Sequence, residues 1–179
     1  MVFKEFDMAV VVFGATGRLG SVLSQVDGII GVTRASCDLR RPSDIEEVIR
    51  RTAPTAVINA AAITDPDFAT RNESLAFAVN ATAPGVMAKT CGDLRIPFVH
   101  FSSDQVFDGA LPMPYIPSDP INPQNAIGRT KAAGEVAVQQ SDGANVILRL
   151  NFMVDGTDDF ARLKLPETEG VLLEAISHD

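Results

Sequence analysis

The chain has 179 residues, 46% of them apolar, and a formal net charge of −8 from 23 acidic and 15 basic side chains. This length and composition suffice for one domain with a full hydrophobic core and argue against disorder. A negative chain without a basic run repels polyanions, so nucleic acid and anionic membrane are excluded as favoured partners. No apolar run is long enough for a membrane span, and the acidic N-terminal stretch does not resemble a secretory signal. We therefore expect a cytoplasmic protein in which Cys37 and Cys91 are buried, reduced thiols.

Short β-branched apolar runs alternate with helical patterns along the chain. Strands are predicted at residues 8–13, 28–33, 55–62, 97–103 and 145–150. Helices are predicted up to about residue 26, at 43–52, at about 72–91 and at about 124–140, and a proline-rich loop covers 111–123. Ser43, with Glu46 three residues later, has the pattern of a capping box. The alternation predicts an α/β fold with a parallel sheet and helices on both faces, in three α/β/α layers.

The first predicted strand–helix junction carries the segment GATGRLG. In such a loop the first glycine permits a tight turn, the second lets backbone amides approach a pyrophosphate, and the third lets helix and strand pack closely. The start of the following helix adds amide donors and partial positive charge. A strand before and a helix after are the context that a dinucleotide-binding loop requires, although a glycine-rich turn that binds nothing fits the same pattern. The candidate pyrophosphate-binding residues are Gly14, Thr16, Gly17, Arg18, Leu19 and Gly20.

The second predicted strand ends at Arg34, where an NAD-type site places an acid for the ribose 2′-hydroxyl. An arginine can instead hold a 2′-phosphate through a charge-assisted fork. We therefore predict NADP as the cofactor, with NAD as the alternative; a solvated surface arginine would also fit this position. Asp38 is expected near the adenine edge of the cofactor, and a helix-cap or loop role fits it equally well.

Six segments follow the order and spacing of one known family: GATGRLG, TAVINAAAITDPD, AFAVNATAPGVMAK, VHFSSDQVFDG, PYIPSDPINPQNAIGRTKAAGE and VILRL. On these segments the chain resembles the dTDP-4-dehydrorhamnose reductase family of extended short-chain dehydrogenases, over roughly residues 8–160. The resemblance implies a doubly wound Rossmann fold that binds a nicotinamide dinucleotide in residues 1–150. It also implies that Ala60, Ala61 and Ala62 lie beside the cofactor, and that Asn80 is the family's helix asparagine near the central sheet.

The resemblance also implies catalytic positions. Ser103 stands at the catalytic threonine or serine, Lys131 at the catalytic lysine that also binds the nicotinamide ribose, and Ile127 at the catalytic tyrosine. In the family's chemistry the tyrosine protonates the alkoxide that forms when hydride reaches a keto carbon, a type of catalysis worth on the order of 10²–10⁴-fold in rate. An isoleucine cannot donate a proton, so we expect cofactor binding to survive better than catalysis.

Other proton donors stay open as alternatives. Tyr115 is the single tyrosine of the chain and lies in the proline-rich loop, outside the predicted catalytic helix. His100 lies in the middle of a predicted strand, a position more typical of a packed core histidine than of an acid. A bound water relayed from Lys131 is a further alternative.

Family members continue well beyond the predicted fifth strand, and that part supplies most of the sugar-nucleotide pocket. We therefore expect residues 151–179 to be a short remnant of the substrate-binding region, and a homodimer or a protein partner to cover the shortened sheet. No metal site is expected.

Three functions compete. The first is an NADP(H)-binding protein with lost or altered reductase activity and an accessory or regulatory role. The second is an active NADPH-dependent reductase with a non-standard proton donor, acting on a small keto or sugar-nucleotide substrate. The third is a domain that acts only through protein contacts. The intact glycine loop argues against the third, and Ile127 with the short C-terminal part argues against the second, so the first is favoured while enzymatic activity stays open.

Overall fold

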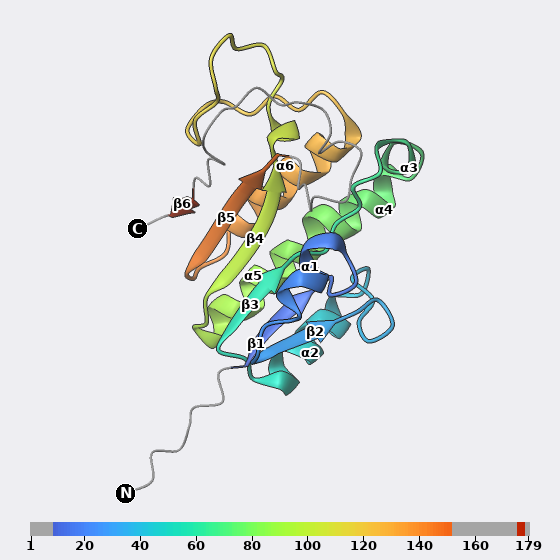
Figure 1. The fold of residues 1–179 in the computed structure, drawn as a ribbon, viewed down its shortest axis with the longest axis vertical. Helices are drawn as coiled ribbons and strands as arrows, with labels where there is room; N and C mark the ends of the chain where they lie inside the picture. The colour runs from blue at the N-terminus through green and yellow to red at the C-terminus, as the bar shows by residue number, and fades with distance from the viewer. Residues whose placement is uncertain (1–8, 152–174, 178–179) are drawn as a thin grey trace, which may run out of the picture.

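The computed structural model describes residues 9–151 and 175–177, which are organised around a twisted sheet (Figure 1). Its strands are β1 (Val10–Phe13), β2 (Ile29–Val32), β3 (Ala56–Asn59), β4 (Phe98–Ser103), β5 (Asn145–Leu150) and β6 (Ala175–Ser177). They lie in the order β2-β1-β3-β4-β5-β6, and all pairs are parallel except β5 with β6. The five predicted strands and the α/β fold class are confirmed. The predicted C-terminal remnant, residues 151–179, lies mostly outside the described residues.

The chain changes direction across the sheet at β1. From β1 it moves to β2 on one side, and it then returns to β3 on the other side. The register aligns Phe13 with Val32 of β2 and with Asn59 of β3, so the three strands end level with one another. Such a switch point opens a crevice at the carboxyl ends of the strands, where open α/β sheets bind their ligands.

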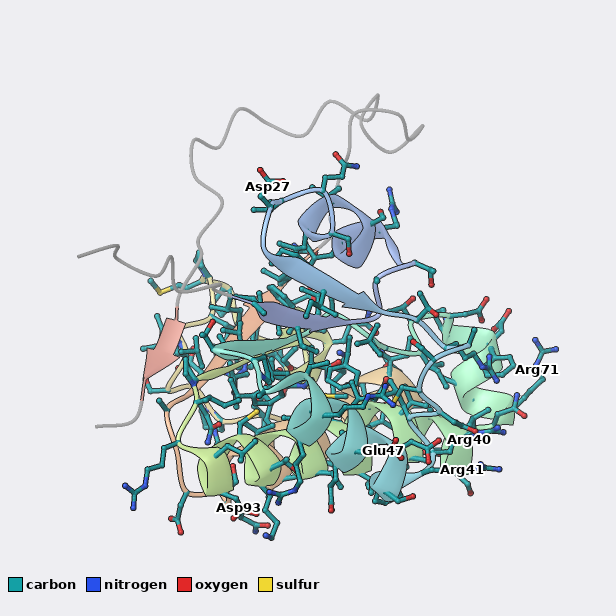
Figure 2. The ribbon with its side chains drawn as sticks, turned by 90° about the horizontal axis from the view of Figure 1, so that it is seen from below. Asp27, Arg40, Arg41, Glu47, Arg71 and Asp93 are labelled. Atoms are coloured by element: carbon teal, nitrogen blue, oxygen red, sulfur yellow. The ribbon has the colours of Figure 1, made fainter. Side chains whose placement is uncertain are left out.

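The helices are α1 (Arg18–Leu23), α2 (Pro42–Thr52), α3 (Pro66–Arg71), α4 (Glu73–Phe77), the π-helix η1 (Ala78–Thr82), α5 (Ala83–Leu94), the 3₁₀-helix η2 (Asp104–Val106) and α6 (Ala126–Gln139). Figure 2 shows α1 on one side of the sheet and α2 and α5 on the other. Helix α5 packs against both α2 and α6, so the predicted layers are present.

The core lies between the sheet and the layer of α2, α5 and α6. Its larger apolar members are Val11, Phe13, Val57, Phe98 and Ile147 from the strands, and Ile45, Val48, Ile49, Met87, Cys91 and Val138 from the helices. Burying an aliphatic or aromatic side chain of this size contributes roughly 1.5–3 kcal/mol each. This burial fixes the sheet whose carboxyl edge carries the site.

The predicted capping box at Ser43 is wrong. Helix α2 begins at Pro42, with Arg41 as its N-cap and without a side-chain cap. A proline has a fixed φ near the helical value, and its missing N–H would have no helical acceptor at the first position, so Pro42 sets the start. The Ser43 hydroxyl instead contacts the carboxylate of Asp44 at 3.4 Å.

The predicted long helix at 72–91 is interrupted by the π-helix η1. Pro84 has no N–H, so the carbonyl of Asn80 lacks the donor that an α-helix would place there. The N–H of Ala83 bonds instead to the carbonyl of Ala78, five residues back. Gly134 of α6 packs directly on this bulge, where a Cβ would lie 2.2 Å from the Asn80 carbonyl oxygen. The bulge and the glycine together bring η1 and α6 into close contact.

A buried ion pair ties β5 to α6 and to the loop that precedes α6. Arg149 donates from Nε and Nη2 to the carboxylate of Glu135, at 2.9 and 2.7 Å. Its Nη1 donates to the carbonyl of Pro117 at 3.0 Å. The guanidinium carbon also lies 4.9 Å from the centroid of the Phe107 ring. One side chain therefore holds three segments together.

We predict that Arg149→Met lowers the free energy of unfolding by about 3–5 kcal/mol, because Glu135 would remain as a buried carboxylate without its partner. Urea unfolding measures the change. The matched control is Arg51→Met, which breaks an exposed pair with Glu47 and should change the free energy by less than about 1 kcal/mol. Equal losses in the two variants would contradict the role assigned to Arg149.

Candidate functional site

The backbone of the glycine-rich turn after β1 packs directly against the backbone of α1 and of the segment after β3. Gly14 has a φ of +84°, which side-chain-bearing residues rarely adopt. A Cβ on Gly14 would lie 2.6 Å from the backbone nitrogen of Ala61, and one on Gly20 would lie 2.0 Å from the carbonyl oxygen of Gly14. The N–H of Gly17, the N-cap of α1, donates to that carbonyl at 2.9 Å. Glycines are therefore required where the turn, α1 and the segment after β3 meet.

A cavity of about 300 Å³ opens at this switch point. It is lined by these predicted cofactor residues: Gly14, Thr16, Gly17, Arg34, Asp38, Ala60, Ala61 and Ala62. The other lining residues are Phe13, Val32, Thr33, Cys37, Leu39, Arg40, Ile63, Phe68, Leu75 and Val79. Most of the second group are apolar, and several come from α3, α4 and η1. The cavity therefore has a polar floor of backbone, a charged rim and an apolar wall.

The charged rim of the cavity includes Arg34, a cation without an ion-pair partner among the described residues. Arg34 is exposed, and within the described residues no hydrogen bond or ion pair engages its guanidinium. Asp38 is held by Arg40, whose Nε donates to the carboxylate at 2.8 Å. The Arg40 hydrogen bonds keep the pKa of Asp38 well below its usual range. The Asp38 charge is thus offset, while Arg34 is available to an anion.

Five predicted cofactor residues do not line the cavity: Arg18, Leu19, Gly20, Asn80 and Lys131. Arg18, Leu19 and Gly20 form the start of α1. Asn80 is fully buried; its Oδ1 accepts from the N–H of Ile63 at 2.8 Å, and its Nδ2 donates to the Ile63 carbonyl at 2.9 Å. Asn80 therefore supports the cavity wall from behind.

Ser103 and Lys131 also lie outside the cavity lining and bond to their own chain. The Ser103 hydroxyl donates to the Asp104 carboxylate at 2.9 Å and accepts from the N–H of Gln105 at 3.2 Å, which caps η2. Lys131 is 5% exposed, and its Nζ donates to the carbonyl of Phe101 at 2.7 Å. Burial lowers the pKa of Lys131 to about 8, against an opposing effect of Glu135.

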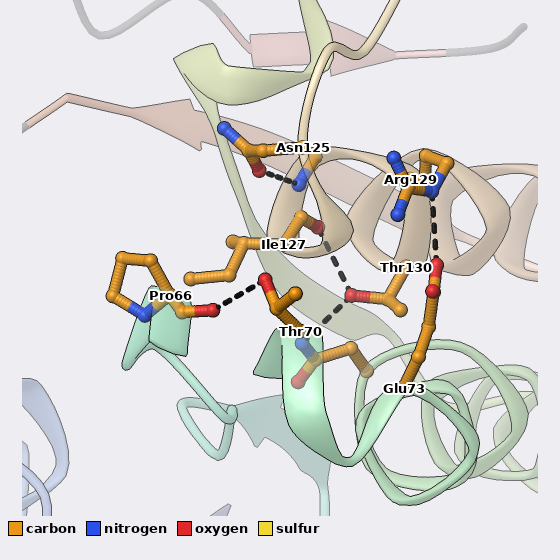
Figure 3. A network of polar contacts seen from close by, with 9 residues as sticks. Pro66, Thr70, Glu73, Asn125, Ile127, Arg129 and Thr130 are labelled. Atoms are coloured by element: carbon orange, nitrogen blue, oxygen red, sulfur yellow. Dashed lines mark hydrogen bonds and ion pairs between the residues drawn. The ribbon is translucent and has the colours of Figure 1, made fainter. Parts of the chain in front are cut away.

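Ile127 is 2% exposed and belongs to a small apolar cluster with Ala69, Ala76 and Ala126. In Figure 3 its side chain points from α6 toward α3. The predicted tyrosine position is therefore occupied by a packed side chain in a helix–helix interface.

Polar contacts hold this interface together. Arg129 of α6 pairs with Glu73 of α4 at 2.9 Å, as Figure 3 shows. The Thr130 hydroxyl donates to the Ile127 carbonyl at 3.0 Å and accepts from Asn80 Nδ2 at 3.0 Å. Helix α6 begins at the N-cap Asn125, whose Oδ1 accepts from the N–H of Gly128 at 2.8 Å. The register that places Ile127 and Lys131 one turn apart is thereby fixed.

The two alternative proton donors are engaged elsewhere. Tyr115 stacks on Phe107 with ring centroids 4.2 Å apart, and its hydroxyl donates to Asp108 at 2.5 Å. That bond, with others from the loop, lowers the pKa of Asp108 to about 2. His100 is a fully buried core histidine, 3.1 Å from the Asn59 amide through Nδ1, and burial together with the Lys131 charge lowers its pKa well below the usual value.

Between residues 9 and 151 no group of three or more His, Cys, Asp or Glu side chains could hold a metal ion. No helix in that described part is long and apolar enough to cross a bilayer.

Comparison with known proteins identifies the family. Residues 8–163 match the model of the RmlD substrate binding domain. The chain belongs to this family. Among its relatives, the dTDP-4-dehydrorhamnose reductase of Burkholderia thailandensis is 38% identical over 140 residues, which cover 76% of this chain and 47% of the relative. The resemblance carried by the six segments is confirmed.

Solved dTDP-4-dehydrorhamnose reductases share the fold. A dTDP-4-dehydrorhamnose reductase from Clostridium acetobutylicum has a TM-score of 0.80 at 29% identity and covers 87% of this chain and 57% of its own. One from Bacillus anthracis, solved in complex with NADP, has a TM-score of 0.79 at 27% identity and covers 82% and 54%. The chain thus spans about half the length of the relatives it matches. The Rossmann-type fold is confirmed.

We predict that Lys131 makes the free energy of unfolding depend on pH between about 8 and 10.5. Burial lowers the pKa of Lys131 from 10.5 to about 8, so between these values the unfolded chain binds a proton that the folded chain has released. The free energy of unfolding should therefore rise with pH across that window, by at most roughly 3 kcal/mol. Lys131→Met should lack this rise.

Urea unfolding at about pH 7.5 and about pH 9.5 measures the effect as the difference between wild type and Lys131→Met. The thiols of Cys37 and Cys91, whose pKa values burial raises to about 11 and about 12, act in the opposite direction, but they do so in both proteins. The same pH dependence in both proteins would show that Lys131 is not titrating in this range.

Proposed function

We propose that this chain binds NADP(H) in the switch-point cavity and has lost or altered the reductase activity of its relatives. The observation that carries the proposal is the cavity itself, floored by the Gly14 turn and rimmed by Arg34. Backbone amides after β1 suit a pyrophosphate, and the apolar wall suits an adenine ring. An accessory or regulatory role in the cytoplasm follows if catalysis is lost.

NADP is preferred over NAD because of the charges on the rim. Arg34 stands where an NAD site carries an acid, and it can form a charge-assisted fork with a 2′-phosphate. The carboxylate of Asp38 is paired with Arg40, so it repels that phosphate less. The relative from Bacillus anthracis, solved in complex with NADP, supports the same choice. NAD remains the alternative cofactor.

Lost tyrosine-type catalysis is supported by the surroundings of Ile127. Its side chain cannot donate a proton, and the hydroxyl of Tyr115 is bonded within its own loop. We extend the proposal to the organisation of the chain: residues 1–150 form the dinucleotide-binding domain, and residues 151–179 belong to the substrate-binding region. A homodimer or a protein partner stays a prediction.

The second candidate is an active NADPH-dependent reductase of a keto sugar nucleotide. It is favoured by Ser103 and Lys131, which keep the family's positions at the end of β4 and on α6. With a pKa of about 8, Lys131 could pass a proton through a water. Relatives named dTDP-4-dehydrorhamnose reductase point to dTDP-linked keto sugars as the substrate class.

We predict that Arg34→Gln lowers the preference for NADPH over NADH by roughly tenfold or more, because a charge-assisted contact contributes roughly 1.5–3 kcal/mol. The fluorescence of the reduced nicotinamide follows binding, and the absence of tryptophan keeps protein emission low. Arg51→Gln, which removes an equal charge from α2 outside the cavity lining, should leave the preference unchanged. If Arg34→Gln had the same ratio of NADPH to NADH affinity as the wild type, the argument for NADP would be wrong.

We predict that Ile127→Tyr gains reduction of a dTDP-linked keto sugar, measured as consumption of NADPH, if the rest of the site is competent. The larger side chain must displace neighbours in the alanine-lined cluster, which costs typically 1–3 kcal/mol. Ile127→Phe is the matched control, because it adds a similar bulk without a proton donor. Activity in both variants would show that the phenol is not the cause, and activity in neither would place the defect outside this position.

A further inference from the structure

We propose that His100 is a positioning residue for the cofactor cavity: through Asn59 it fixes the backbone of Ala61, against which the Gly14 turn packs. His100 belongs to β4 and does not line the cavity. This inference rests on the proposed function, because it concerns the binding of a dinucleotide in that cavity. It adds a residue that acts from behind the cavity floor.

Two polar contacts in series lead from His100 to the cavity floor. His100 and Asn59 are paired residues of β4 and β3, and both are buried. Asn59 Nδ2 lies 3.1 Å from His100 Nδ1, and Asn59 Oδ1 accepts from the N–H of Ala61 at 3.1 Å. Ala61 lines the cavity, and a Cβ on Gly14 would lie 2.6 Å from the Ala61 nitrogen. A change at Asn59 therefore reaches the Gly14 turn through one residue.

The contact with Ala61 also fixes the tautomer of His100. Since Asn59 Oδ1 faces the N–H of Ala61, the Asn59 amide presents its NH₂ group to the imidazole ring. His100 Nδ1 is therefore the acceptor, and the ring proton is on Nε2. Burial and the charge of Lys131 lower the pKa of His100 well below its usual value, so the ring is neutral and Nδ1 stays an acceptor.

The contact with Asn59 is the hydrogen bond that His100 makes within the described residues. His100 Nε2 is buried without a hydrogen-bond partner in that part of the chain, and the ring stacks on Phe98 with centroids 6.3 Å apart. A buried donor without a partner is costly, and an apolar side chain at this position would avoid the cost. Packing alone therefore does not account for an imidazole here, whereas the acceptor that it supplies to Asn59 does.

Three variants separate the acceptor from the packing. His100→Leu removes the acceptor, and His100→Asn keeps one, because the oxygen of the new amide can take the place of Nδ1. Ser102→Ala is the matched control: it changes another buried polar side chain of β4, which has no hydrogen-bond partner in the described residues. Circular dichroism and urea unfolding establish the conditions under which every variant is folded.

Fluorescence titration with NADPH and with NADH measures the effect on binding under these conditions. We expect His100→Leu to weaken both cofactors by the same factor, roughly threefold to tenfold for one lost hydrogen bond, with their ratio unchanged. His100→Asn and Ser102→Ala should bind both cofactors within about twofold of the wild type. A residue with a purely structural role would change the unfolding midpoint and leave these affinities unchanged.

Nuclear magnetic resonance measures the same contacts without a ligand. The nitrogen spectrum of His100 should show a protonated Nε2 and an unprotonated Nδ1. Hydrogen exchange of the Ala61 N–H should be faster in His100→Leu than in the wild type, because Asn59 Oδ1 is then no longer held in place. In His100→Asn the exchange should stay as slow as in the wild type.

Wild-type affinity in His100→Leu would overturn the inference. Equal losses in His100→Leu and His100→Asn would do so too, because the packing and not the acceptor would then be responsible. A proton on Nδ1 would contradict the direction of the contact with Asn59. If the wild type bound neither cofactor, the proposed function would be refuted instead, and the tautomer and the exchange of Ala61 would still decide whether His100 holds this segment.

Discussion

The site depends on one backbone contact, the approach of the β1 turn to the segment that follows β3. Gly14 and Ala61 come so close that no side chain fits between them. Asn59 fixes the segment after β3. Its Oδ1 accepts from the N–H of Ala61 at 3.1 Å, and its Nδ2 contacts Nδ1 of His100 on β4 at 3.1 Å. The buried histidine thus has a structural role: it contacts Asn59, whose side chain fixes the segment after β3 beside the Gly14 turn. The crevice is therefore fixed before any ligand arrives.

Helix α6 is held in place by contacts to η1, β5 and α4. Gly134 fits it against η1, and Glu135 fixes it to β5 through Arg149. Arg129 fixes it to α4 through Glu73. Among so many constraints the helix cannot rotate to present another side chain at the position of Ile127. The isoleucine at position 127 is thus packed into a rigid part of the fold.

The sequence predicted the parts of the site that local rules govern. Gly14 and Gly20 mark the turn in the sequence because a Cβ at either position would clash with backbone atoms, and Arg34 was predicted from its place after a strand. The apolar wall could not be found in this way, because Phe68, Leu75 and Val79 look like ordinary core positions until the fold brings them to the cavity. Helix α3 was missed although Asp65 before a proline is a helix-start signal, and the Asp65 side chain does cap Phe68 N–H at 2.7 Å.

Lys131 separates the two candidate functions most sharply, because its presence is not explained by stability. A buried ammonium is costly, and the fall of its pKa to about 8 expresses that cost. Its single hydrogen bond inside the described residues, to the Phe101 carbonyl, is one that a neutral donor could make equally well. The packing of α6 therefore does not explain the lysine, and Lys131 is the residue on which the second candidate function depends most.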